Sequence, residues 1–272
     1  MNSRSDDQNL VSRIQASRKY RVVGIPEETI LDVYTREKGR LTNTEEALRV
    51  TKAKLHNILA LYLGDLDYPQ ARADLDNAFA RENHQAIGQI CARLLACHHS
   101  TLERLSYYPA FFQTIQKACG KLNTLLDLAC GLNPFALALV DLPATVRYHA
   151  YDIHAPRVNL INQFFELSGR PALAEVRDVL VRPPKIAADA AILLKEAHRM
   201  EKRRAGAARE LVSALNASVI FISLPNRSMD GRRDLRERMR SLMERICGED
   251  FLITGSEEFP SETLFWLRRI HA

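Results

Sequence analysis

The chain has 272 residues, of which 46% are hydrophobic and 26% are charged, and its net charge is +5 at pH 7. This composition is typical of a soluble globular protein that can bury a full core in one large domain or two modest ones. No apolar run is long enough to span a bilayer, the N-terminus lacks the apolar core of a signal peptide, and the five cysteines form no CxxC pair. We therefore expect a cytoplasmic protein with reduced thiols, no membrane contact and no metal site.

The first 105 residues carry helical patterns and no strand pattern. Their apolar positions recur at helical spacing, and acidic residues follow the predicted helix starts. The predicted helices lie around 11–17, from Pro26, from Asn43 or Thr44 to about Leu63, from Pro69, and from Ile87 to Leu105. We interpret 1–105 as a separate helical domain. Within it Arg18, Lys19 and Arg21 surround Tyr20, a cluster that suits either RNA contacts or an ordinary helix terminus.

From residue 106 onward, helices alternate with strands. A helix is predicted over Tyr108–Cys119, and strands are predicted over 124–129, 146–151, 172–176, 189–194, 218–224, 251–258 and 263–269. The first five strands are separated by crossover segments and are expected to be parallel, whereas the short link over 259–262 makes the last two an antiparallel hairpin at the sheet edge. The expected fold is α/β: a Rossmann-like sheet with a reversed terminal strand, as in S-adenosylmethionine (SAM) methyltransferases, preceded by an all-helical N-terminal domain.

The turn over 125–134 carries the main cofactor signal. An apolar run contains Asp127, passes Gly131 and stops at Asn133-Pro134, and Asp152 closes another strand-like run 21 positions after the glycine. That spacing places a ribose-holding carboxylate beside a nucleoside cofactor. The alternative is a structural strand-to-helix turn in another kind of α/β protein.

The charge is unevenly placed along the chain. Residues 195–245 hold 13 Lys and Arg against 7 Asp and Glu. A local basic excess suits a polyanionic partner, although a solvated helical face explains it equally well.

Five motifs together resemble the aminoglycoside-resistance 16S rRNA (guanine-N7) methyltransferases. They are His99-Ser100-Thr101-Leu102-Glu103-Arg104, Asp127-Leu128-Ala129-Cys130-Gly131-Leu132-Asn133-Pro134, Tyr151-Asp152-Ile153, Asp178-Val179-Leu180 and Ser223-Leu224-Pro225-Asn226-Arg227-Ser228. The resemblance implies an RNA-docking domain over 1–105, a SAM-dependent methyltransferase domain over 106–272, and S-adenosyl-L-homocysteine as product. It also implies methylation of guanine N7 in the decoding A site of the 30S subunit, aminoglycoside resistance, and no obligate protein partner.

The resemblance also assigns cofactor roles to individual residues. It pairs Arg104 with the methionyl carboxylate, Asp152 with both ribose hydroxyls, and Asp178 with the adenine amino group, although Asp178 could instead be a helix N-cap. A glycine at 131 would let the backbone approach the methionyl part. The full predicted cofactor set is Arg104, Asp127, Ala129, Gly131, Asp152, Ile153, Asp178, Val179, Leu194 and Lys195.

No general base is assigned, because guanine N7 already has a lone pair and needs positioning more than proton transfer. The positioning candidates are Lys195, Glu201, Pro225, Arg227 and Glu262. The predicted RNA contacts are Arg18, Lys19, Arg21, Arg49, Lys52, Lys54, His56, Arg227, Arg232 and Arg233, with the basic helix over 232–245 as a further phosphate-binding element.

The chain departs from the family pattern where the target base is expected. Glu196-Ala197-His198 replaces Leu-Leu-Pro, and Arg233-Asp234-Leu235 replaces Lys-Gly-Met. His198 is interpreted as either a base contact or a solvent-facing loop residue. Two alternatives to guanine-N7 methylation in the A site follow: methylation of another RNA position, or a non-catalytic RNA-binding protein with a SAM fold.

Overall fold

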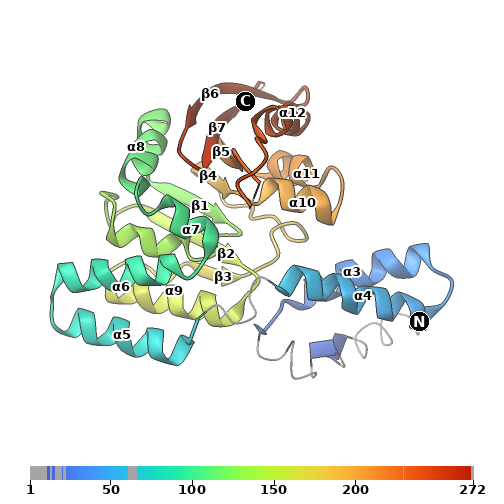
Figure 1. The fold of residues 1–272 in the computed structure, drawn as a ribbon, viewed down its shortest axis with the longest axis horizontal. Coiled ribbons are helices and arrows are strands. Elements are labelled where there is room, and N and C mark those ends of the chain that lie inside the picture. Colours follow the sequence, from blue (N-terminus) through green and yellow to red (C-terminus); the bar gives the residue numbers. More distant parts are fainter. Residues whose placement is uncertain are drawn as a thin grey trace.

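A computed structural model describes residues 11–12, 14–15, 20, 23–60, 66–228 and 230–270. Its centre is a seven-stranded sheet in the order β3-β2-β1-β4-β5-β7-β6 (Figure 1). The strands are β1 (Thr124–Leu128), β2 (Arg147–Asp152), β3 (Ala174–Val176), β4 (Ala188–Leu194), β5 (Ala217–Pro225), β6 (Phe251–Glu258) and β7 (Glu262–Arg269).

The strand directions confirm the predicted sheet. Strands β1 to β5 are parallel, and β7 runs antiparallel to both β5 and β6. The reversed strand therefore lies inside the sheet, and β6 forms the edge. Because the central strands are parallel, the carboxyl ends of β1, β2 and β4 meet at one edge, where ligands bind in open α/β sheets.

Helices flank the sheet and extend beyond it. They are α3 (Glu27–Arg40), α4 (Thr44–Leu59), α5 (Tyr68–Ala80), α6 (His84–Ala96), α7 (His99–Arg104), α8 (Tyr108–Cys119), the 3₁₀ helix η2 (Asn133–Ala138), α9 (Ala155–Leu167), α10 (Ala197–Arg203), α11 (Ala207–Ala214) and α12 (Arg236–Cys247). The single helix predicted over 87–105 is wrong, because the backbone of His98 is extended (φ −124°, ψ 129°) and divides it into α6 and α7. The predicted start of α4 is confirmed, since Asn43 Oδ1 accepts hydrogen bonds from the backbone N–H groups of Glu45 (2.8 Å) and Glu46 (3.3 Å).

Alternate residues of the central strands fill two separate cores. Ala190 and Ile192 of β4 face a core shared with α5, α6, α8 and α9. Ala191 and Leu193 face the other side, where α10, α11 and α12 pack. Both faces of the central strands are thus covered, which explains why these strands are almost entirely apolar in sequence.

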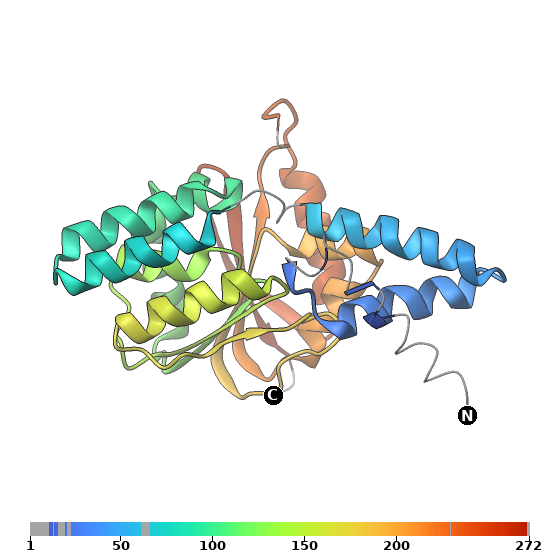
Figure 2. The same ribbon diagram turned by 90° about the horizontal axis from the view of Figure 1, so that it is seen from below.

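The helices α3 and α4 form a third core outside the two sheet layers. Their buried residues include Ile30, Leu55 and Leu59, and Ile153 from the end of β2 packs against this cluster. Figure 2 shows this pair (blue) projecting away from the sheet, on the side opposite α5 and α6. The helices α5 and α6 belong to the sheet core, so the cores divide between Leu59 and Leu66. The predicted domain boundary at residue 105 stays a prediction.

None of the helices described is both long and apolar enough to cross a bilayer.

Candidate functional site

A narrow cleft lies at the carboxyl ends of β1, β2 and β4. Six predicted cofactor residues line it: Arg104, Ala129, Gly131, Asp152, Leu194 and Lys195. Its volume is about 60 Å³, well below the roughly 300–1,000 Å³ typical of small-molecule sites.

Backbone strain concentrates around this cleft. Ala129 (φ 51°) and Lys195 (φ 55°) are non-glycine residues in the left-handed region, one after β1 and the other after β4. Each such residue costs on the order of 1–3 kcal/mol and persists where the surrounding structure fixes it, commonly at a functional site. Gly131 (φ 56°) adopts the same conformation without that cost.

Asp152 is held in place by backbone amides. Its Oδ2 accepts a hydrogen bond from the N–H of Gly131 (3.0 Å), and its Oδ1 accepts one from the N–H of His154 (2.9 Å). A carboxylate has about four acceptor positions, so each oxygen keeps one for a further donor. The two hydroxyls of a ribose match that requirement, and Asp152 fits its predicted role.

Arg104 is buried, and its guanidinium is bound by Glu262. Nε and Nη2 contact the two carboxylate oxygens at 2.5 and 2.8 Å, and Tyr107 Oη donates to Oε1 of the same carboxylate at 2.9 Å. Burial alone would raise the pKa of Glu262, but the charge of Arg104 outweighs it and lowers that pKa. The Nε–Nη2 face of Arg104 is therefore occupied by Glu262, and a methionyl carboxylate would have to bind the remaining N–H groups. Glu262 holds Arg104 and does not itself line the cleft.

Lys195 closes the cleft on the β4 side. Its ammonium pairs with Glu103 and donates to Ser261 Oγ at 2.8 Å. Its backbone N–H donates to the carbonyl of Ser223 at 3.0 Å, which ties the strained residue to β5. This position fits contact with the cofactor or the substrate at the end of β4.

Asp127 lies beneath the turn and outside the cleft lining. Its Oδ2 accepts hydrogen bonds from Asn133 Nδ2 (2.9 Å) and Tyr148 Oη (2.6 Å). Burial raises its pKa to about 7, although both hydrogen bonds favour the charged form. In this structure Asp127 braces the turn that presents Gly131, and direct contact with the cofactor stays a prediction.

Asp178, the predicted adenine contact, and Ile153, another predicted cofactor residue, are covered by the α3 side of the molecule. Asp178 Oδ2 accepts a hydrogen bond from Thr29 Oγ1 (2.9 Å) and pairs with Arg203 Nη1 (2.7 Å), while Oδ1 accepts from the N–H of Leu180 (3.1 Å). The hydrogen bond from the N–H of Leu180 resembles that of a helix N-cap, which was the alternative interpretation of Asp178. Val179 is buried in the sheet core. The predicted adenine role of these residues is untested, and it requires α3 to form a wall of the pocket.

Sequence reasoning missed several residues that line the cleft. They are His98, Ser100, Thr101, Cys130, Arg157, Glu196 and Arg199. Arg157 is buried, and its Nη1 lies 3.7 Å from Asp152 Oδ2. Burial raises the pKa of Glu196 to about 7. The first three lie in or beside the motif over 99–104, and so could have been found, whereas Arg157 has no local signal.

The remaining positioning candidates lie outside the cleft lining. Glu201 accepts hydrogen bonds from the N–H groups of Gly206 and Ala208, both at 2.9 Å, so its carboxylate caps α11. Pro225 ends β5 opposite Glu262. Glu201 therefore serves the fold in this structure.

His198 is not in a loop, as one interpretation held, but in the first turn of α10. It is half-buried, and its Nδ1 has no hydrogen-bond partner among the described residues. Burial, followed by the charges of Arg199 and Lys202, lowers its pKa to about 4. The imidazole is therefore neutral near pH 7.

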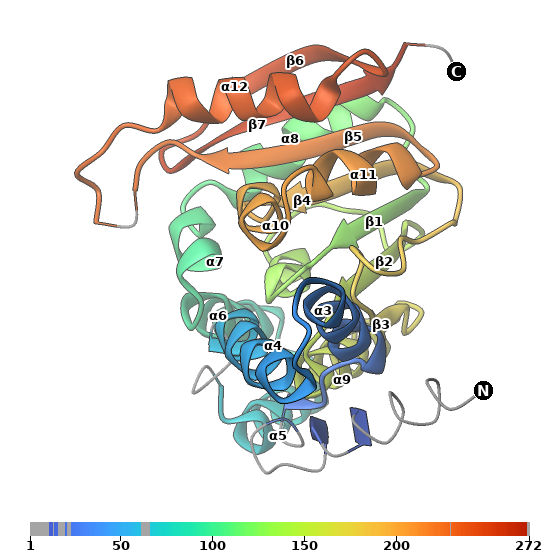
Figure 3. The same cartoon turned by 90° about the vertical axis from the view of Figure 1, so that its right-hand side faces the viewer.

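The predicted RNA contacts fall into three groups. Arg18, Lys19 and Arg21 lie outside the described residues. Arg49, Lys52, Lys54 and His56 are exposed on α4, where Lys54 pairs with Glu37 at 2.5 Å. Arg227, Arg232 and Arg233 are exposed in the segment between β5 and α12, which projects from the body of the protein beyond the carboxyl end of β5 (Figure 3).

Comparison with known proteins agrees with this geometry. A curated protein from Frankia casuarinae named 16S rRNA (guanine(1405)-N(7))-methyltransferase is 31% identical over 82% of this chain and 80% of its own length. A protein of the same name from Serratia marcescens is 26% identical over 95% of this chain and 97% of its own. The crystal structure of the 16S rRNA methyltransferase RmtF in complex with S-adenosyl-L-homocysteine is 26% identical, superposes with a TM-score of 0.78, and covers 99% of both chains.

The family expected from the motifs is confirmed by a family model that matches most of the chain. The model is described as ribosomal RNA methyltransferase (FmrO) and matches residues 16–252. The match includes the β1 turn, Asp152 and α10, which build the cleft. The chain therefore belongs to the FmrO family of ribosomal RNA methyltransferases.

Proposed function

We propose that this chain uses SAM to methylate N7 of a guanine in the decoding A site of 16S rRNA, within the assembled 30S subunit. Such a modification would give aminoglycoside resistance and would take place in the cytoplasm. The observation that carries the proposal is the cleft itself, where Asp152 is aimed by Gly131 and His154 beside the strained turn after β1. The named relatives support the choice of substrate.

The charged side chains of the cleft suit the methionyl and ribose parts of SAM. Asp152 offers two acceptor positions to a diol, and Arg104 offers a cation to a carboxylate. When bound, SAM supplies a methyl group on a positively charged sulfur. The guanine N7 lone pair displaces the sulfur in line, so the chain has no proton to remove and acts by positioning.

The RNA-facing cations lie at the same edge of the sheet as the cleft. The projecting segment with Arg227, Arg232 and Arg233 follows β5, whose carboxyl end lies beside that of β4. Cations in such a segment suit phosphate contacts that fix the register of the RNA while the cofactor acts on one base. The exposure of these three arginines near the end of β5 supports the proposal that RNA binds close to the methyl donor.

A second candidate function is methylation of a different RNA position. The observation in its favour is His198, a neutral imidazole in a segment that departs from the family pattern and lies next to Glu196 and Arg199 of the cleft. A different base-facing group is a physical reason for a different target base.

The test is methyl transfer from labelled SAM to 30S particles, to protein-free 16S rRNA and to tRNA, with mass mapping of the modified base. We expect label in 30S particles at one A-site guanine, and aminoglycoside resistance when the chain is expressed in a sensitive host. Asp152→Asn should abolish transfer, and Asp141→Asn, at an exposed position, should not. Label at another position would favour the second candidate. SAM binding without transfer to any of these RNAs would refute both.

A further inference from the structure

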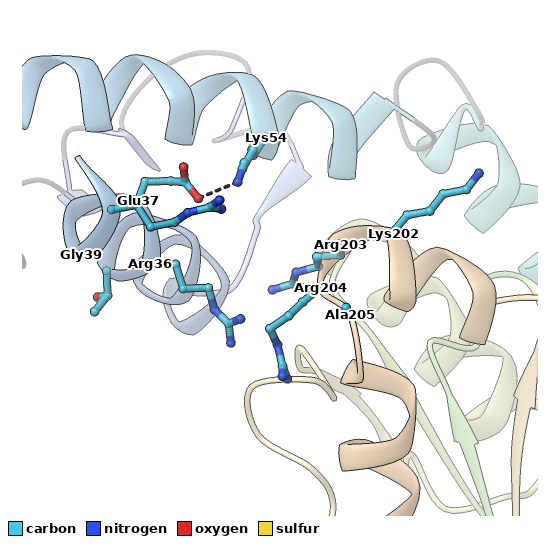
Figure 4. Close-up of a pocket in the computed structure, with 10 residues that line it drawn as sticks. Arg36, Glu37, Gly39, Lys54, Lys202, Arg203, Arg204 and Ala205 are labelled. Atoms are coloured by element: carbon cyan, nitrogen blue, oxygen red, sulfur yellow. Dashed lines mark hydrogen bonds and ion pairs between the residues drawn. The ribbon is translucent and has the colours of Figure 1, made fainter. Parts of the chain in front are cut away.

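A second hollow, larger than the cofactor cleft, lies between the α3–α4 pair and the C-terminal end of α10. We call it the α3–α10 groove, and its volume is about 680 Å³. Six cations line it: Arg36, Arg40 and Lys54 on one side, and Lys202, Arg203 and Arg204 on the other. Glu37 is the one acid in its lining. Figure 4 shows Arg36 and Arg203 reaching toward each other from opposite sides.

Four of the six cations are paired within the protein. The pairs are Arg36 with Asp32 (2.8 Å), Lys54 with Glu37 (2.5 Å), Arg203 with Asp178 (2.7 Å), and Arg204 with Glu210. Asp32 also lies 3.3 Å from Arg203, so this carboxylate joins the two sides of the groove. Of the pairs named here, the one between Asp32 and Arg203 crosses the groove and holds α3 against α10.

The other two cations are not explained in this way. Arg40 and Lys202 are exposed, one on each side of the groove, and no ion pair holds either of them in the part of the chain that the structure describes. Two positive charges without an ion pair among the described residues, both of which border one open groove, suit a polyanion partner.

The place of the groove identifies the polyanion. Glu196 and Arg199 line the cofactor cleft, and Arg203, one turn further along α10, lines the groove. One helical turn is about 5.4 Å, and a stacked nucleic-acid strand advances about 3.4 Å per nucleotide. A strand whose target base enters the cleft would therefore bring phosphates only one or two nucleotides away to the groove.

We propose that the α3–α10 groove binds backbone phosphates of the rRNA strand immediately beside the methylated nucleotide, with Arg40 and Lys202 as the charges that meet them. This inference rests on the proposed function and adds a site to it. An enzyme that acts on a base has to hold that base out of its stack, and phosphates gripped on the flanking nucleotides fix the extruded conformation. Because the groove lies between the α3–α4 pair and α10, phosphates bound there would also fix the position of the docked RNA relative to the cofactor.

The test compares Arg40→Ala, Lys202→Ala and the double variant with the wild-type chain. Both side chains are exposed and free of ion pairs, so SAM affinity measured by calorimetry should stay unchanged. We expect the double variant to raise KM for 30S particles about 10-fold with kcat within about twofold, and to reduce the slope of log affinity against log salt by about 1.4, or 0.7 for each lost phosphate contact. The matched control is Lys117→Ala with Lys121→Ala, two exposed cations on and just after α8.

The outcomes separate this proposal from the proposed function. If the wild-type chain methylates 30S particles and the double variant keeps both KM and the salt slope, the groove proposal is refuted and the function stands. If the wild-type chain binds 30S particles without methylating them, the proposed function is refuted. The groove proposal is then tested by binding alone, through the difference in salt slope between the wild-type chain and the double variant. An equal loss in the Lys117 and Lys121 control would show a general charge effect and would also refute the groove.

Discussion

Replacement of Glu262 by Gln tests whether the buried ion pair between Arg104 and Glu262 stabilises the fold at the cofactor cleft. The substitution preserves shape but removes the negative charge that holds Arg104 at 2.5 and 2.8 Å. Both residues are at most 1% exposed, so Arg104 would be left as a buried cation without compensation. Removing one partner of such a pair costs about 3–5 kcal/mol of unfolding free energy. At roughly 2–4 °C per kcal/mol, the melting temperature should fall by at least about 6 °C.

The matched control is Glu258→Gln, which removes the same kind of pair at the surface. Glu258 lies 2.6 Å from Arg236, and both side chains are about half exposed. Exposed pairs contribute about 0–1 kcal/mol. Urea unfolding of both variants at pH 7 measures the difference, and a change of less than about 1 kcal/mol in Glu262→Gln would refute the reasoning.

The pH dependence gives the same prediction an independent check. Arg104 lowers the pKa of Glu262 in the folded state, despite the opposing effect of burial. The stabilisation is therefore fully present above the ordinary carboxyl pKa of about 4.3 and is lost as the pH falls through the lower, folded-state value. The gap between wild type and Glu262→Gln should begin to narrow as the pH falls below about 4.3 and should close below the folded-state pKa, and a gap that does not narrow on acidification would mean that packing, and not charge, is what the substitution removes.

Three further substitutions test the cleft. Asp152→Asn should weaken SAM binding by about 100-fold in calorimetry, because it removes the charged acceptor for two hydroxyls; an unchanged affinity would exclude its ribose role. Burial raises the pKa of Asp127 to about 7, so between about pH 4 and 7 the folded state keeps a proton that the unfolded state has lost, and the wild type loses unfolding free energy as the pH rises through this range. Asp127→Asn has no such proton and should not show this loss; parallel pH profiles of the two proteins would contradict this. Thr29→Val should cost about 1 kcal/mol in urea unfolding, because it breaks the hydrogen bond to Asp178, while Thr35→Val, at an exposed position of the same helix, should not.

Local patterns in the sequence predicted the strands and their directions well, because strand pattern and connection length are local features. The order of the strands within the sheet was not predicted. The apolar run around Asp127 is typical of a buried parallel strand. The short link over 259–262 is too short for a crossover helix, so the two strands that it joins have to be antiparallel. The same reasoning joined α6 and α7 into one helix. Their apolar residues share one helical spacing, and periodicity does not detect a single extended residue such as His98.

The site was less predictable, because its residues are defined by partners far away in sequence. Nothing around Arg157 marks it, since an arginine in the first turn of a helix usually faces solvent; here α9 follows β2 directly and carries it back over Asp152. Glu201 was predicted as a positioning candidate, and the structure shows its carboxylate bound to the N–H groups that begin α11, which nothing near it in the sequence indicates. In both cases the residue type is ordinary, and only tertiary placement decides its role.

Asp178, the predicted adenine contact, connects several elements of the fold. Its two oxygens accept from Leu180 and Thr29 and pair with Arg203, so it connects the end of β3, helix α3 and helix α10. Arg203 in turn reaches Asp32, which binds Arg36 on the far side of the groove. This chain of contacts runs from the expected adenine end of the cleft to the floor of the α3–α10 groove. If the adenine amino group binds Asp178 as predicted, it would have to compete with these partners, and cofactor binding would then be coupled to the contact between α3 and α10.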